Sequence, residues 1–184
     1  MLRDSARGIP LRRSTAIWRV KIATWRWEMP LKMAISTSRD SPLPFCSAAA
    51  AAKRMGYEPR VALLSYSNFG NPDWPSAERV RDAVTVLDGR AVDFEYEGDI
   101  NADVALDDEL RKRLYPFARL SGPANVLIMP ALQSANISAK LLKIIGGANV
   151  IGPSLMGLSK SAQIVPMGAT VSEVVNLAAL AAHA

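Results

Sequence analysis

Few residues in this 184-residue chain have the chemistry of a catalytic base or nucleophile. The only histidine, His183, lies one residue from the C-terminus, and the only cysteine is Cys46. A Ser-His-Asp or Cys-His apparatus therefore cannot be assembled within the domain. One cysteine also provides neither an internal disulfide nor a thiolate cluster for zinc. GPSLMG lacks the spacing of a nucleophile elbow, and no glycine-rich phosphate loop occurs.

The remaining polar candidates lie in three loops, SYSNFGNP, PALQSAN and LSKSAQIVPMGAT. Their donors and small residues suit a phosphate, an amide or a pantetheine chain, although loop serines and asparagines usually bond their own backbone. The candidates are Ser65, Ser67, Asn68, Gln133, Ser134, Asn136, Lys160 and Gln163. A separate acidic group, Asp99, Asp103, Asp107 and Asp108, is compatible with a cation site. Its position favours a turn followed by a helix N-terminus.

Alternating strands and helices from residue 47 onward would position these loops. Short apolar runs at 60–66 and 124–130 are typical of buried strands, and 91–98 alternates like a half-exposed strand. NVIGPSL and AQIVP indicate two more short strands. The sequence therefore predicts an α/β fold with an open, mainly parallel sheet and helices on both faces. In such sheets ligands bind beyond the carboxyl ends of the strands.

Five helices are expected around this sheet. The first closes at Gly56, Ser76 caps the second, DDELRKRLYP forms the third, Gly146 closes the fourth and Thr170 caps the last. Helical spacing of apolar residues predicts the faces that turn toward the core. These residues are Val80, Ala83, Val84 and Leu87; Ile137, Leu141, Ile144 and Ile145; and Val171, Val174, Val175 and Ala178.

The net charge of +5 comes from the N-terminal region. Residues 1–40 contain nine Lys and Arg but three Asp and Glu, whereas the rest of the chain is close to neutral. A misassigned start, an organelle transit peptide and a cationic, tryptophan-bearing arm for single-stranded nucleic acid all fit such a segment. We expect residues 1–44 to be a basic, disordered or non-native extension ahead of a domain formed by 45–184, and residues 1–40 to pack little against that domain. No apolar run is long enough to span a bilayer.

Five blocks together resemble the C-terminal half of the phosphate acetyltransferase/butyryltransferase family. They are VALLSYSNFG, EGDINADVAL, ANVLIMPALQSANISAKLL, IGPSLMGLSK and VNLAALAA, and the likeness runs from about Pro59 to Ala182. It implies an isocitrate/isopropylmalate-dehydrogenase-like fold, dimerisation and a coenzyme A thioester as ligand. Because the family domain is longer, the resemblance implies a partial, C-terminal piece of it.

The last loop departs from the family pattern. In acetyltransferases of this family a Ser-Arg pair precedes the glycine of this loop and an aspartate follows in the next helix. Here the glycine is Gly168, the pair is Pro166 and Met167, and the acid position falls on Glu173. Proline and methionine offer no side-chain donor for a phosphate. Loss of a charge-stabilising group lowers rates by orders of magnitude, so we expect no catalytic residues in this chain.

A transferase-like domain without that pair resembles the C-terminal extension of bacterial NADP-dependent malic enzymes. The resemblance implies a regulatory and oligomerising role, with acetyl-CoA bound but not turned over. Its expected ligand residues are Ser65, Ser67, Ser134, Asn136, Lys160, Gly168, Thr170 and Glu173. Malate oxidation, NADP and a divalent metal would belong to a separate malic enzyme module, and this chain would hold no cofactor or metal.

Two other functions remain open at this point. A stand-alone phosphate acyltransferase would need an arginine at or beside Met167, and a nucleic-acid-binding protein would depend wholly on the basic N-terminus. We expect a cytoplasmic homo-oligomer, at least a dimer, with no nucleic-acid or membrane partner. The apolar helices at 133–145 and 170–182 are the predicted interface, with Leu142, Leu177 and Leu180 lying outside their inward faces.

Overall fold

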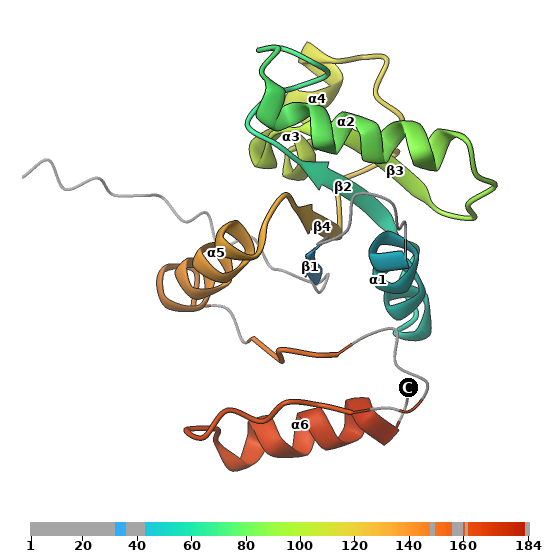
Figure 1. Cartoon of the computed structure of the whole chain (residues 1–184). Coiled ribbons are helices and arrows are strands. Elements are labelled where there is room, and N and C mark those ends of the chain that lie inside the picture. The colour runs from blue at the N-terminus through green and yellow to red at the C-terminus, as the bar shows by residue number, and fades with distance from the viewer. Residues whose placement is uncertain (1–31, 36–42, 148–149, 156–159, 161, 183–184) are drawn as a thin grey trace, which may run out of the picture.

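The computed structural model describes residues 32–35, 43–147, 150–155, 160 and 162–182 (Figure 1). The strands are β1 (Lys32–Ile35), β2 (Arg60–Leu64), β3 (Glu95–Ile100) and β4 (Val126–Met129). The helices are α1 (Leu43–Arg54), α2 (Pro75–Asp88), α3 (Ala102–Leu106), α4 (Asp108–Leu114), α5 (Leu132–Ile145) and α6 (Val171–Ala182). None of the described helices has the length and apolar character needed to cross a membrane.

The four strands form one sheet in the order β1-β4-β2-β3, and every pairing is parallel. Parallel neighbours require crossover connections, which here are helical. In Figure 1, α1 and α5 lie on opposite sides of β1 and β4. This confirms the predicted open parallel sheet with helices on both faces.

Alternation along the central strands divides the core in two. Val61 and Leu63 of β2 point to one face, where they pack with α1 and α2. Ala62 and Leu64 point to the other face, where they pack with α3 and the first turn of α5. Both faces of β2 and β4 are buried, which explains why these strands are continuous apolar runs rather than alternating ones.

Three predicted elements differ in detail from the structure. Helix α2 begins at Pro75 with Trp74 as its N-cap, so the prediction of Ser76 as the cap is wrong. A proline suits the first helical position because its missing N–H would have no partner there. The strands expected in NVIGPSL and AQIVP are also wrong, since their described parts contribute one isolated bridge between Ser154 and Gln163.

The face predictions hold for α2 and fail for α5 and α6. Val80, Val84 and Leu87 are buried under α2. By contrast, the four α5 residues expected to face the core are more than half exposed, and Ile144 is 80% exposed. Val171, Val174, Val175 and Ala178 of α6 are exposed too, whereas Leu177, expected at an interface, is buried. Helix α5 touches the sheet mainly near Ala135 and then runs beyond it (Figure 1).

The N-terminal region contributes one strand to the sheet. Lys32–Ile35 pairs in parallel with Val126–Met129, so the expectation that residues 1–40 pack little against the domain is wrong for these four. Of the run KMAI only the isoleucine is enriched in strands, so this strand depends on the edge of β4, which provides its hydrogen-bonding partners. Residues 1–31, which include three tryptophans, lie outside the described residues.

Candidate ligand-binding site

The loop after β2 is fastened to the end of β3 by a buried carboxylate. Asp99 accepts hydrogen bonds from the Ser67 hydroxyl and from the Gly70 backbone N–H at 3.1 Å. Its backbone oxygen accepts from the Phe69 N–H at 2.7 Å. The side chains of Asp99 and Ser67 are both essentially inaccessible to solvent. A buried carboxylate needs such partners, so this loop has a defined shape.

Three asparagines add further hydrogen bonds between these loops. Asn68 and Asn71 exchange backbone hydrogen bonds of 2.9 and 3.1 Å across the turn. The Asn68 side-chain oxygen accepts from the Asn101 backbone N–H at 2.8 Å. With its amide turned to suit both neighbours, Asn101 also donates to the backbone oxygens of Ser65 and Tyr66. Hydrogen bonds therefore connect the loop that follows β2 to the loop that follows β3.

The structure brings the predicted Ser65 and Ser67 together, with their hydroxyl oxygens 3.5 Å apart. The Ser65 oxygen accepts from the Ser67 N–H at 3.2 Å, and the Ser67 hydroxyl donates to Asp99. Ser67 thus shapes the loop from inside, and Ser65, at its rim, is the more accessible donor.

Arg81 is a residue of this site that the sequence analysis did not identify. Its Nη2 donates to Asp73 at 2.6 Å, and its Nη1 lies 3.9 Å from an Asp99 oxygen. That Nη1 is buried and makes no hydrogen bond to any described residue. Arg81 sits between the apolar positions of α2, where any charged residue fits the helical pattern, so no sequence signal pointed to it.

The acidic residues between Asp103 and Asp108 bond to a turn and to the N-terminus of α4, as the sequence favoured. Asp107 caps α4 by accepting from the Leu110 N–H at 2.9 Å, and Asp103 accepts from the Val104 N–H at 2.9 Å. Asp108 pairs with Arg111 and, at 2.7 Å, with Lys112, which is the main cause of its lowered pKa. No acidic, histidine or cysteine cluster among the described residues could hold a metal ion.

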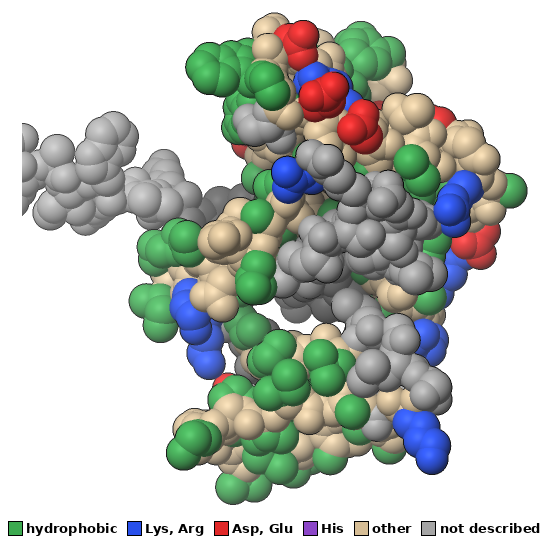
Figure 2. Space-filling view, viewed as in Figure 1, with side chains coloured by type: hydrophobic (Ala, Val, Ile, Leu, Met, Phe, Trp, Pro, Cys, Tyr) green, Lys and Arg blue, Asp and Glu red, His purple; other side chains and the backbone are tan. Residues whose placement is uncertain are grey.

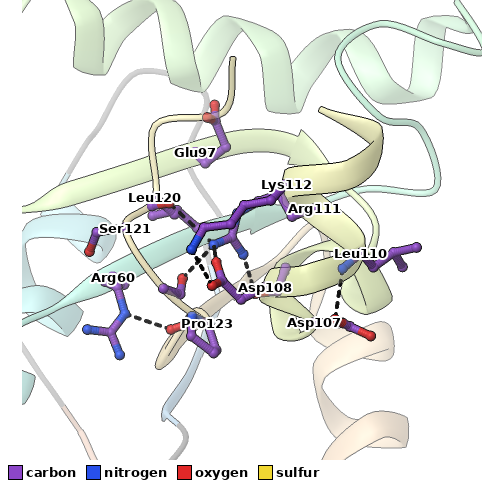
Figure 3. Close-up of polar contacts among 12 residues, drawn as sticks. Arg60, Glu97, Asp107, Asp108, Leu110, Arg111, Lys112, Leu120, Ser121 and Pro123 are labelled. Atoms are coloured by element: carbon purple, nitrogen blue, oxygen red, sulfur yellow. Dashed lines mark hydrogen bonds and ion pairs between the residues drawn. The ribbon is translucent and has the colours of Figure 1, made fainter. Parts of the chain in front are cut away.

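A buried arginine anchors the segment between α4 and β4 (Figure 3). Arg111 donates to the Asp108 carboxylate, to the Leu120 carbonyl at 3.3 Å and to the Gly122 carbonyl at 2.9 Å. Arg60, at the start of β2, donates to the Pro123 carbonyl at 2.7 Å. These bonds hold residues 115–123 against the sheet without regular secondary structure.

The other predicted residues lie on α5 and before α6. The Ser134 hydroxyl donates to the Ala131 carbonyl at 2.7 Å, and the Asn136 side chain is exposed. Lys160 is exposed, as are Pro166, Met167 and Gly168, and the Ala169 N–H closes a turn onto the Pro166 carbonyl at 3.0 Å. Met167 is fully exposed to solvent.

Thr170 caps α6 as predicted, in a reciprocal arrangement with Glu173. The Glu173 N–H donates to the Thr170 hydroxyl oxygen at 3.3 Å, and the Glu173 carboxylate accepts from the Thr170 N–H at 2.7 Å. This is the capping-box pattern. The hydrogen bond from the Thr170 backbone N–H, followed by those from its hydroxyl and Lys143, lowers the pKa of Glu173. The carboxylate at the family's acid position therefore serves to begin a helix.

The described hydrogen bonds do not join the candidate residues into one site. Glu173 approaches Lys143 at 3.4 Å, near the far end of α5. Ser134 lies nine residues earlier in that helix, a rise of about 14 Å. No hydrogen bond among the described residues joins Ser65, Ser67, Ser134 or Asn136 to the Gly168–Glu173 group.

Residues 45–182 match the model of the phosphate acetyl/butaryl transferase family. The chain belongs to this family. It is 59% identical over 136 residues to the NADP-dependent malic enzyme of Rhizobium meliloti (strain 1021), covering 74% of this chain and 18% of that enzyme. It is 38% identical over 137 residues to the phosphate acetyltransferase of Paracoccus denitrificans, covering 74% of this chain and 43% of that protein.

The crystal structure of a phosphotransacetylase from Streptococcus pyogenes has the same fold. It superposes with a TM-score of 0.75 at 28% identity, covering 82% of this chain and 46% of that chain. The chain thus spans under a fifth of the malic enzyme and under half of the phosphotransacetylases. The resemblance to the transferase family and to the malic enzyme C-terminal region is confirmed.

Proposed function

We propose that this family member is the regulatory and oligomerising module of an NADP-dependent malic enzyme. In this proposal it binds acetyl-CoA without transferring the acetyl group, and the intact enzyme converts malate to pyruvate and carbon dioxide in the cytoplasm. NADP and a divalent metal would bind to the malic enzyme module, outside this chain. The observation that carries the proposal is the chemistry of the loop before α6.

That loop lacks the groups needed for acyl transfer to phosphate. Pro166 and Met167 occupy the positions at which the family's transferases have serine and arginine, and Met167 points into solvent. The remaining acid, Glu173, is engaged by Thr170 and Lys143. A transition state with developing negative charge would meet no fixed cation at position 167.

The same loop keeps features that suit an anionic ligand. After Thr170 and Glu173 have capped each other, the backbone N–H groups of Val171 and Ser172 remain at the start of α6, where the helix dipole favours negative charge. Lys160 is exposed and adds a cation. Ser65 and Asn136 supply polar groups elsewhere on the proposed ligand surface.

Inhibition of the intact malic enzyme tests the regulatory role. Acetyl-CoA should lower malate oxidation, and Lys160→Ala should weaken this inhibition while leaving the uninhibited rate nearly unchanged. Lys140→Ala is the matched control, because Lys140 is an exposed lysine on α5 outside the proposed ligand residues. Equal inhibition of the wild type and Lys160→Ala would show that Lys160 does not bind acetyl-CoA. A wild type that acetyl-CoA does not inhibit would reject the regulatory role.

A direct assay separates the alternative function, a stand-alone phosphate acyltransferase. The similarity to the Paracoccus denitrificans phosphate acetyltransferase favours testing it. Acetyl phosphate formation from acetyl-CoA and phosphate should stay at background for the wild-type chain. Robust formation of acetyl phosphate would reject the non-catalytic proposal and support the acyltransferase.

A further inference from the structure

Three aromatic rings meet where the loop after β2 reaches the end of α4. The Phe69 ring lies 4.9 Å from the Tyr115 ring and 4.8 Å from the Phe117 ring, measured between centroids. Phe69 and Tyr115 pack onto the core beneath α3, but Phe117 is 66% exposed. We call these three residues the aromatic platform. Since its outer ring is open to solvent, the platform has an unused stacking surface.

The backbone of Phe69 adopts a conformation that bulky residues avoid. Its φ is 51°, and it is the one positive-φ residue other than glycine in the described chain. Such conformations persist where surrounding bonds fix them, and they concentrate at ligand sites. Here the Asp99 carbonyl holds the Phe69 N–H, and the Asn68–Asn71 turn fixes both sides. The loop is thereby shaped to direct this ring onto Tyr115 and Phe117.

The other half of the platform is equally fixed. Tyr115 ends α4, with its N–H donating to the Arg111 carbonyl at 2.7 Å. The Arg111 side chain, buried below, holds the chain that continues from Phe117 at Leu120 and Gly122 (Figure 3). A flat ligand would therefore meet ordered rings and lose little of its binding free energy in arranging them.

Cationic groups flank the platform. The aliphatic part of the Arg81 side chain lies near Gly70, the residue that follows Phe69. A Cβ atom added to Gly70 would lie 4.0 Å from Arg81 Cδ. The Nη1 of Arg81 is buried beside Asp99, but the side chain as a whole is 29% exposed, and an anion would meet this exposed part of the guanidinium. Arg113, in the last turn of α4, is exposed and has no partner among the described residues. Aromatic rings beside arginine side chains are complementary to a nucleobase that carries phosphates.

We infer that the aromatic platform stacks the purine of an adenine nucleotide and that Arg81 pairs with its phosphate. The platform follows β2 and β3 at the carboxyl end of the sheet, which is where open α/β sheets bind ligands. This inference rests on the proposed function, because it assigns the nucleotide portion of a CoA thioester to Phe69, Tyr115 and Phe117. In Figure 1 the loop after β2 and α4 lie at the same end of the molecule.

Binding of ADP to the full 184-residue chain, measured by calorimetry, tests the platform apart from any acyl group. Phe117→Ala should weaken ADP binding about tenfold, the effect of losing one base–aromatic stack. Phe117→Trp should restore it. Trp74→Ala is the matched control, because Trp74 is a similarly exposed aromatic residue with no ring contact to the platform. Arg81→Lys should weaken ADP binding and leave adenosine binding unchanged.

The possible results separate this inference from the proposed function. If the wild type fails to bind ADP, or if Phe117→Ala and Trp74→Ala bind it equally, the inferred stacking of the purine on the platform is rejected. If Phe117→Ala weakens ADP binding but CoA binds no more tightly than ADP, the platform stands and the CoA-thioester function is rejected. If acetyl-CoA inhibits the intact enzyme and Phe117→Ala changes neither ligand's affinity, the function stands and the platform is rejected.

Discussion

At the scale of single residues, the most consequential side chain is the buried guanidinium of Arg111. Arg111 is 1% exposed and donates to one carboxylate and several backbone carbonyls. Its role is to order residues 115–123, which have no strand or helix to order them. An arginine suits this role because its planar fork presents five donors in a fixed geometry.

Arg111→Ala should therefore lower the free energy of unfolding by about 3 kcal/mol or more, the usual cost of breaking a buried ion pair from one side. Lys112→Ala removes the other cation beside Asp108, but that lysine is largely exposed. It should cost at most about 1 kcal/mol. Urea unfolding of both variants measures the difference, and equal losses would contradict a structural role for the buried guanidinium.

Asp88 gives a pH-dependent prediction at the same scale. The Tyr96 hydroxyl and the Arg119 guanidinium donate to it at 2.7 and 2.6 Å, and these bonds lower the pKa of Asp88. A carboxyl whose pKa is lower in the folded state stabilises the fold above its unfolded value, about pH 3.9, and loses this contribution as the pH falls through the folded value. Asp88→Asn should thus be less stable than wild type at pH 7.

The stability gap between wild type and Asp88→Asn should shrink as the pH falls from 5 to 3. Thermal unfolding across that range measures it. Asp82→Asn is the control, since Asp82 is an exposed carboxylate on the same helix with no bonded partner in the described chain. A gap that stays constant down to pH 3 would show that the charge of Asp88 contributes nothing.

At the scale of elements, the helices differ in how well their sequence patterns predict which face is buried. Helix α2 alternates apolar and charged residues, so its buried face was predictable. Helices α5 and α6 are apolar beyond one face, and periodicity alone could not tell which side meets the sheet. Figure 2 shows hydrophobic side chains spread over both of them.

The candidate site was predictable only in part, for a related reason. Loop serines and asparagines were visible in the sequence, as was the Thr170 cap. The bond from Ser67 to Asp99 and the position of Arg81 depend on how three elements meet at the end of the sheet. No local spacing encodes such contacts. Strand β1 was missed because four residues inside a basic segment carry too little pattern.

The capping box of α6 leads to a local prediction. Thr170→Ala should speed amide hydrogen exchange in the first turns of α6 roughly fivefold, from the loss of about 1 kcal/mol of capping. Amides of β2 and β4 should keep their wild-type rates because α6 lies apart from the sheet (Figure 1). Ser172→Ala is the control, because Ser172 lies two residues after Thr170 in the same first turn of α6. Uniform acceleration throughout the chain would instead indicate that the cap supports the whole fold.

At the scale of the whole molecule, α5 and α6 expose apolar surface that a soluble monomer rarely leaves open. We expect self-association through these helices. Ile144→Lys should shift the protein toward monomer in light scattering at micromolar concentration, because a charge would replace an 80% exposed isoleucine. Val86→Lys, at an exposed valine of α2, should leave the oligomeric state unchanged. A monomeric wild type would contradict the prediction.

Strand β1 also affects how this protein can be shortened. The family match begins at residue 45, whereas β1 ends ten residues earlier and covers the edge of β4, whose four residues are all buried. A chain trimmed to the matched region would leave Val126–Met129 as an open, uncharged edge, which is a template for intermolecular strand pairing. Such a chain should aggregate on storage, as followed by turbidity, and one beginning before Lys32 should stay clear. Strand β1 would then be what keeps the sheet of this chain from pairing with other molecules.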